Sequence, residues 1–165
     1  MDLKKENGFE NQSIQNKFEN ETIRHKIENN VEYIQFKRLL EYPEINHAYI
    51  LKSFNRNFRV GKDFFNIENV KKDLVEVAQT IGMNDEGIVR PDFNHTNQVD
   101  TITKLDEKEK PNLKGVHFPE TDGLITKEKN IVLMATNADC NLILIYDPVQ
   151  KIIANVHARM ERYFW

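Results

Sequence analysis

The chain has 165 residues, of which 23 are Lys or Arg and 26 are Asp or Glu, so its formal charge is −3. This length predicts one domain, or at most one and a half. A single cysteine excludes both a disulfide framework and a zinc or redox module of paired cysteines, which favours the cytoplasm. Six dispersed glycines exclude the glycine-rich loops of two nucleotide-binding architectures, and no pattern indicates nucleic acid, a membrane or a protein partner.

Charged and amide residues dominate the start of the chain. We expect residues 1–22 to form a disordered or frayed extension, and residues 23–158 to form the folded domain. Ile23–Ile27 and Val31–Phe36 are β-capable runs on either side of the turn-forming residues 28–30. This pattern predicts a hairpin at the entry to the domain.

The middle of the chain predicts short strands around one helix. The first strand, His47–Leu51, precedes a basic and aromatic loop. Residues 66–82 predict the helix, because Asn66 is a good N-cap, apolar residues recur every three or four positions, and Gly82 follows the last of them. We expect two further strands, Gly87–Arg90, which Pro91 ends, and Gln98–Thr103. Residues 105–114 predict a charged, solvated loop.

The last third of the chain is the most apolar. Three segments rich in Ile, Val and Leu predict core strands, at Asn130–Thr136, Asn141–Tyr146 and Lys151–Val156. Taken with the helix, they predict an α+β fold with a mixed, largely antiparallel sheet and flanking helices.

The last two of these strands bring a thiol and an imidazole close together. Asp147–Gln150 has Asp and Pro in the first two positions of a type I turn, so we expect Tyr146 to face Lys151. Counting outward in that register places Cys140 opposite His157, with Cβ atoms about 5 Å apart. Such a pair could bind one transition metal or act as nucleophile and base.

His95 is a third candidate, because it lies in a loop between two expected strands, where ligands often bind. Two His and one Cys with an open fourth position match a catalytic zinc site, in which the metal activates a water. The alternative is structural: a lone buried Cys also behaves as a small apolar residue, and the five histidines show no local ligand spacing.

Several short motifs resemble those of a known family. The chain resembles the laccase-domain family, also called multicopper polyphenol oxidases, whose bacterial members are described as purine nucleoside phosphorylases with adenosine deaminase side activity. The resemblance covers most of the chain, from about residue 31 to 158, and rests on segments in the family's order: His47–Lys52, His95–Val99, Asp122–Thr126, Thr136–Cys140, Tyr146–Pro148 and Val156–Ala158.

The resemblance implies a site and a reaction. His95, Cys140 and His157 match the family's zinc or copper ligands, which gives Cys140 a catalytic role as a ligand, and Lys52 stands where an Arg is usual and would bind phosphate. The implied substrates are phosphate and purine nucleosides (adenosine, inosine or methylthioadenosine), cleaved to a base and ribose 1-phosphate, with deamination of adenosine as a second activity. The alternatives are a copper-dependent polyphenol oxidase or an inactive remnant.

The C-terminus departs from the family, which continues from Ala158 as Gly-Trp-Arg-Gly-Thr. The reading GCA GGA TGG AGA GGT ACT TTT GG encodes such a continuation, and one A inserted after GCA yields the Ala-Arg-Met-Glu-Arg-Tyr-Phe-Trp of residues 158–165. We therefore expect residues 159–165 to be an out-of-frame tail on a fold incomplete at the C-terminus.

This expectation predicts that the DNA downstream of codon 165 continues in the +1 frame with family sequence; sequencing that region would test it. The apolar hairpin would then lack neighbouring strands, so we also expect low stability and impaired activity. Soluble protein with one bound zinc and normal adenosine phosphorolysis would contradict the second expectation.

Overall fold

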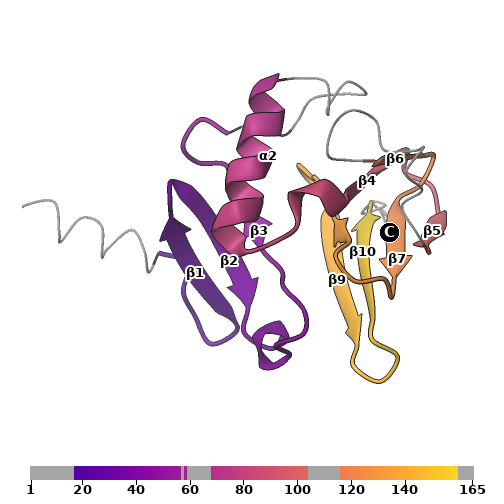
Figure 1. Ribbon diagram of the computed structural model, residues 1–165, viewed down its shortest axis with the longest axis horizontal. Coiled ribbons are helices and arrows are strands. Elements are labelled where there is room, and N and C mark those ends of the chain that lie inside the picture. The colour runs from indigo at the N-terminus through magenta and orange to yellow at the C-terminus, as the bar shows by residue number, and fades with distance from the viewer. Residues whose placement is uncertain (1–16, 57, 59–67, 104–115, 160–165) are drawn as a thin grey trace, which may run out of the picture. The chain divides into compact units, whose positions relative to one another are not determined.

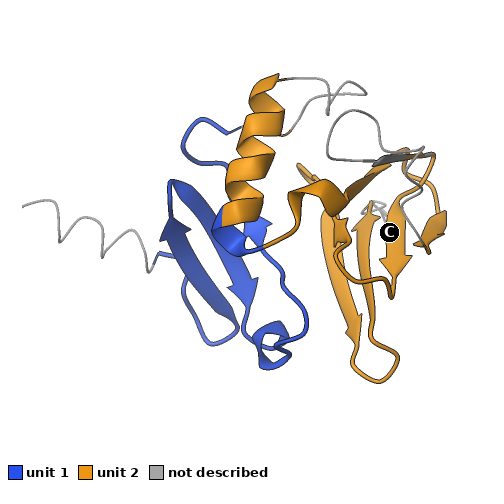
Figure 2. Cartoon of the chain, viewed as in Figure 1, with its two compact units in different colours: residues 1–56, 80–82 blue, residues 57–79, 83–165 orange. Residues whose placement is uncertain are grey.

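The computed structural model describes residues 17–56, 58, 68–103 and 116–159 (Figure 1). The chain divides into two compact units, residues 1–56 with 80–82 and residues 57–79 with 83–165 (Figure 2), and each is described by itself. The expected domain boundaries at residues 22 and 158 remain predictions. In the described part of the chain, no helix has the length and apolar character needed to cross a membrane.

The first unit contains the predicted hairpin. Strand β1 (Ile23–Glu28) pairs antiparallel with β2 (Val31–Phe36), and Glu28 lies opposite Val31. The two turn residues between them, Asn29 and Asn30, have φ values of 50° and 58°. Asn tolerates this left-handed conformation, which two-residue hairpin turns of the primed types require. The hairpin prediction is therefore confirmed.

A third strand completes this sheet, whose order is β1-β2-β3. β3 (Tyr49–Ile50) is shorter than the predicted strand, and a 3₁₀ turn, η1 (Leu39–Glu41), precedes it. The chain between them is held by His47, which is buried. Nε2 of His47 accepts the Phe36 backbone N–H at 2.8 Å, and the Gln35 amide donates to the His47 carbonyl at 3.0 Å.

The helix, most of which belongs to the second unit, follows the predicted pattern. α2 (Glu68–Ile81) buries Val70, Leu74, Val77 and Ala78. Its end is a Schellman-type cap: Gly82 has a φ of +70°, and the Met83 N–H donates to the Ala78 carbonyl at 2.8 Å. The predicted N-cap, Asn66, lies outside the described residues, as do residues 105–114. Two of the buried residues of α2, Val70 and Leu74, pack in a cluster with Ile88, Phe58, Val132 and Met134.

A short 3₁₀ turn, η3 (Asp85–Gly87), precedes β4, the central strand of a three-stranded parallel sheet. The order of this sheet is β6 (Val116–Pro119), β4, β8. Its central strand, β4 (Ile88–Asp92), continues through Pro91, so the prediction that Pro91 ends this strand is wrong. β8 (Val132–Leu133) pairs only with Ile88 and Val89. The backbone nitrogen of Pro91 faces the same neighbouring strand as that of Val89, which is β8. Because β8 ends before the position opposite Pro91, the missing N–H of Pro91 breaks no ladder bond.

A four-stranded mixed sheet, ordered β5-β7-β10-β9, forms the rest of this unit. β5 (Val99–Ile102) runs parallel to β7 (Gly123–Thr126), and the other two pairs of neighbours are antiparallel. The last two strands are β9 (Asn141–Asp147) and β10 (Ile152–Ala158), close to the predicted bounds. One face packs in a core around Val89, Ile102 and Leu124, whereas Val99, Ile143 and Ile145 on the other face are exposed.

These elements give the predicted α+β class, with two further differences in detail. The predicted strand Asn130–Thr136 is reduced to the two residues of β8. The strands β6 (Val116–Pro119) and β7 were not predicted, because each has four residues and neither shows a regular alternation of apolar and polar positions.

The burial of His47 predicts a pH dependence of stability. Burial lowers the pKa of His47 below 6.5, and Nε2 already accepts a backbone N–H, so the folded state favours the neutral ring. The unfolded state binds the proton first as pH falls. The stabilisation is therefore fully present above pH 6.5, and is lost between that value and the lowered folded pKa, with a slope of at most about 1.4 kcal/mol per pH unit.

Urea unfolding at pH 8 and pH 5 would measure this effect. His47→Gln keeps an acceptor for Phe36 but does not titrate in this range, so it is the matched comparison. We expect the wild type to lose more stability than the variant between the two pH values. Equal losses would show that His47 is not the responsible group.

Candidate metal centre

The β9–β10 hairpin positions two of the predicted ligands, in a register different from the predicted one. Ile152 lies opposite Asp147 and His157 lies opposite Leu142, so the predicted pairs Tyr146–Lys151 and Cys140–His157 are wrong. The loop has four residues, 148–151, but it lies one residue later in the chain than predicted. Asp147 ends the strand and caps the loop, because its Oδ1 accepts the backbone N–H groups of Val149 and Gln150 at 2.8 and 3.0 Å.

The error in register does not separate the ligands. It displaces every cross-strand pair by two residues, and an even displacement keeps each side chain on the same face of the sheet. Cys140 precedes β9 and is two residues from Leu142, the partner of His157. Cys140 and His157 are therefore on the same side, as diagonal rather than direct neighbours.

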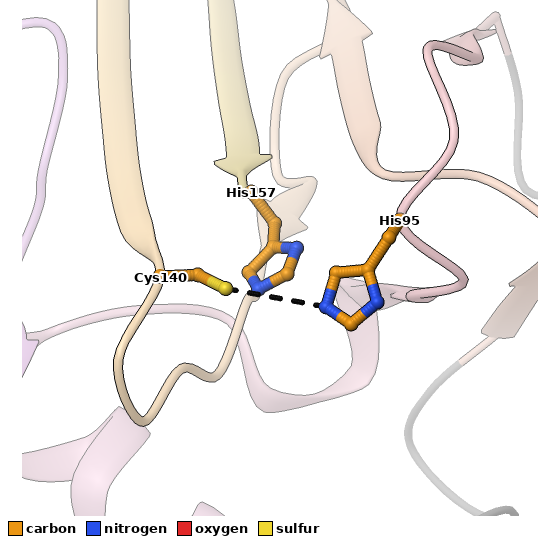
Figure 3. A group of neighbouring side chains, drawn as sticks. All are labelled: His95, Cys140 and His157. Carbon is orange, nitrogen blue, oxygen red and sulfur yellow. Dashed lines mark hydrogen bonds between the residues drawn. The ribbon is translucent and has the colours of Figure 1, made fainter. Parts of the chain in front are cut away.

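Three segments of the second unit bring His95, Cys140 and His157 together (Figure 3). His95 lies in the loop between β4 and β5, Cys140 lies just before β9, and His157 lies near the end of β10. One potential ligand atom of each residue lies within 4.8 Å of the others, and Cys140 Sγ is 4.0 Å from His95 Nε2. His95 is exposed, Cys140 is half-buried and His157 is buried, so the group opens to solvent on one side.

The donor set fits zinc or copper. A thiolate and two imidazoles are ligands that both metals favour. In a tetrahedral zinc site, ligand atoms of this kind are about 3.5 Å apart. The separations in the trio are slightly wider, and small side-chain movements would close them. Three protein ligands leave a coordination position open, which is the pattern of catalytic rather than structural zinc sites.

The carboxylate of Asp122 supports two of the three residues. It is 3% exposed and lies just before β7. Oδ1 accepts the His157 Nδ1–H at 3.1 Å and the His95 backbone N–H at 3.1 Å. Oδ2 accepts from the backbone N–H of Thr96 and from its hydroxyl, the latter at 2.8 Å. Burial would raise the pKa of Asp122, but the hydrogen bonds from Thr96, His157 and His95 outweigh that effect and lower it.

This arrangement determines which nitrogen of His157 is free. An ionised carboxylate only accepts hydrogen bonds, so the proton of a neutral His157 ring resides on Nδ1. Nε2 then carries the lone pair that a metal requires. Such carboxylate–histidine pairs are the usual outer support of metal-binding histidines.

Phe93 and an open cavity complete the surroundings. The Phe93 ring lies 4.4 Å from the His157 ring, centroid to centroid, and covers one side of it. A cavity of about 470 Å³ lies beside His95 and His157, and its other walls include Gln98, Val99, Val156 and Arg159. The two histidine rings are 5.5 Å apart between centroids. A small polar molecule in this cavity therefore has access to His95 and His157, the two members of the trio that line it.

Two further residues, Lys52 and Asp122, are not members of the trio. Lys52, the predicted phosphate ligand, lies in the first unit and is exposed, and its role remains a proposal. Asp122 was recognised from the sequence only as the first residue of a motif, without a role. An Asp followed by Gly at the start of a strand was the available signal, but its partners are 26 to 35 residues away.

Comparison with known proteins agrees with these motifs. A family model described as multi-copper polyphenol oxidoreductase laccase matches residues 45–159. The purine nucleoside phosphorylase YlmD of Bacillus subtilis is 30% identical over 90 residues, which are 54% of this chain and 32% of that protein. A purine nucleoside phosphorylase of Corynebacterium glutamicum is 31% identical over 106 residues, or 64% of this chain and 39% of that protein.

A solved structure is also similar. The hypothetical protein YfiH of Bacillus licheniformis has a TM-score of 0.51 and 21% identity, over 78% of this chain and 45% of that one. This likeness concerns the fold. The matched segments span about a third of the length of the two curated relatives.

Removal of the thiol should abolish stoichiometric metal binding. After reconstitution with Zn²⁺ and dialysis, we expect one ion per wild-type chain and much less in Cys140→Ala, since the two imidazoles alone bind more weakly than the complete trio. Elemental analysis would measure the content, and the thiolate-to-metal charge-transfer band of the Co²⁺ form would report the sulfur ligand. Asp139→Ala removes a neighbouring exposed acid and should change neither. Equal metal content in Cys140→Ala and wild type would disprove the assignment.

Proposed function

The chain belongs to the multi-copper polyphenol oxidoreductase laccase family, and we propose that it acts on purine nucleosides as a metal-dependent purine nucleoside phosphorylase. The observation that carries the proposal is the convergence of His95, Cys140 and His157, within 4.8 Å of one another, beside an accessible cavity. The name of the relatives supplies the substrate class.

The proposed reaction is phosphorolysis of adenosine, inosine or methylthioadenosine. A phosphate oxygen forms the new bond to the sugar C1′, the bond from C1′ to the purine nitrogen breaks, and the purine leaves with that electron pair and takes up a proton. A zinc or copper ion on the trio would act as a Lewis acid toward an oxygen of the substrate. We assign Cys140 its catalytic role as one of the three ligands.

The chain's own residues prepare the site for this chemistry. Asp122 holds the proton of His157 on Nδ1 and keeps Nε2 available. Phe93 covers one side of the His157 ring and excludes water there. The exposed ring of His95 lies on the open side, where the nucleoside would enter.

We further propose that Lys52 binds phosphate. Its ammonium group is a compact positive charge suited to an anion, but it lacks the planar, two-pronged geometry with which Arg grips a phosphate. Weak phosphate binding would follow from this difference. We place the protein in the cytoplasm, in keeping with its single thiol.

Two other activities have specific support. Hydrolytic deamination of adenosine is favoured by the open coordination position of a three-ligand set. Phenol oxidation is favoured by the description of the family model. It ranks lower, because the described residues offer one group of three ligands, whereas a multicopper oxidase needs several copper centres.

One assay separates these activities. Purified protein loaded with Zn²⁺ or Cu²⁺ would be incubated with inosine or adenosine, with and without phosphate, and the products separated by chromatography. We expect phosphate-dependent release of the free base, lost in Cys140→Ala, and a higher KM for phosphate in Lys52→Ala.

The other outcomes are equally specific. Phosphate-independent conversion of adenosine to inosine would identify a deaminase. Copper-dependent oxygen uptake with a phenol, without nucleoside cleavage, would favour the oxidase. A metal-loaded chain inactive in all three assays would be the inactive remnant, and the proposal for this chain would fail.

A further inference from the structure

Asp122 joins two ligands of the trio that come from different segments of the chain. Its carboxylate contacts the His157 side chain and the His95 backbone, and its own backbone contacts His157 again, since the His157 N–H donates to the Asp122 carbonyl at 2.7 Å. The Asp122 N–H in turn donates to the Gln98 carbonyl at 3.1 Å. Asp122 is therefore fixed by the sheet on both sides.

We infer that Asp122 is the positioning residue of the metal centre: one buried carboxylate selects the nitrogen that His157 presents and holds the loop that carries His95. The inference rests on the metal site proposed above. It makes metal affinity depend on a side chain that does not belong to the ligand set.

The first part follows from the donors around the carboxylate. Its two oxygens accept from the His157 ring, the His95 and Thr96 backbones and the Thr96 hydroxyl. An ionised carboxylate can only accept, so the His157 ring donates to it from Nδ1, and in the neutral ring Nε2 carries the lone pair.

The second part concerns the backbone of His95. This residue has a φ of 55°, a left-handed conformation that is uncommon outside glycine. It lies in an exposed loop, so packing alone does not hold it. Asp122 accepts hydrogen bonds from the His95 and Thr96 N–H groups and from the Thr96 hydroxyl. These bonds offset the conformational cost and direct the His95 ring toward the other two ligands.

The third ligand is held separately. Within the part of the chain that the structure describes, Cys140 makes no hydrogen bond to Asp122; its carbonyl accepts instead from the Asn137 amide at 2.7 Å. Loss of the Asp122 carboxylate should therefore affect the two histidines and leave the thiol in place. In other metal sites, loss of such a support weakens metal affinity about 10- to 100-fold.

The test compares Asp122→Asn with Asp100→Asn. The second variant makes the same change at a carboxylate of β5 that accepts from Gln98 and Thr121 but contacts no ligand. Zinc affinity would be measured by competition with a chromophoric chelator. Long-range ¹H–¹⁵N NMR of the metal-free chain at pH 8 would report the His157 tautomer. We expect Asp122→Asn to bind zinc about 10- to 100-fold more weakly and to show protonation at Nε2, whereas Asp100→Asn matches the wild type.

Thr96→Ala provides a second variant in case Asp122→Asn does not fold. It loosens the His95 loop without touching the His157 ring, so we expect a smaller loss of affinity with an unchanged tautomer.

The outcomes separate the two proposals. Failure of the wild type to bind zinc would remove the metal site itself. Normal zinc binding together with wild-type affinity and tautomer in Asp122→Asn would leave the metal site standing and overturn the positioning role. An affinity loss in Asp100→Asn equal to that in Asp122→Asn would also overturn it, because a general weakening of the sheet would then explain both.

Discussion

The candidate site depends on the register between β7 and β10, and on the pair that lies just beyond the end of their ladder. Val156 lies opposite Gly123, so the next pair outward is His157 and Asp122, joined by a backbone hydrogen bond of 2.7 Å. Facing residues project to the same side of a sheet, and this brings the carboxylate to the imidazole. Gly123 permits the register, since a Cβ there would lie 3.1 Å from a methyl of Val99 and 3.2 Å from a methyl of Val156. A larger residue would require both valine side chains to shift.

Local signals predicted the local parts of the fold. The hairpin around Asn29 and Asn30 and the helix ended by Gly82 both follow from residues close together in the sequence. Pro91 shows the limit of such signals. A proline ends a strand only where its N–H would have been needed, and that depends on how far β8 extends, more than 40 residues later in the chain. β7 was not predicted for a related reason. It has only four residues, and its position between β5 and β10 is determined by tertiary packing.

The predicted trio was assembled from a wrong register. Period-two alternation makes the face of a strand residue depend only on whether the displacement is even or odd. The Asp147 turn limited the error to two residues, which left Cys140 and His157 on one side. His95 was placed by motif and not by geometry, because a loop position cannot be counted from a ladder. Prediction of the role of Asp122 would have required both the β7–β10 register and the path of the loop that follows β4.

The same alternation has a cost on the opposite face of the sheet. Side chains alternate between the two faces of these strands. Because His157 lies on the core face, Val99, Ile143 and Ile145 lie on the opposite face, where their exposed fractions are between 44% and 52%. Apolar side chains exposed on one face of a sheet favour association. A metal ion at the proposed site would stabilise this unit, because it would join the three segments that carry His95, Cys140 and His157. The ligands do not converge in an unfolded chain, so the free energy of binding would add to the free energy of folding. At the proposed metal site, chemistry and stability would therefore depend on the same three side chains.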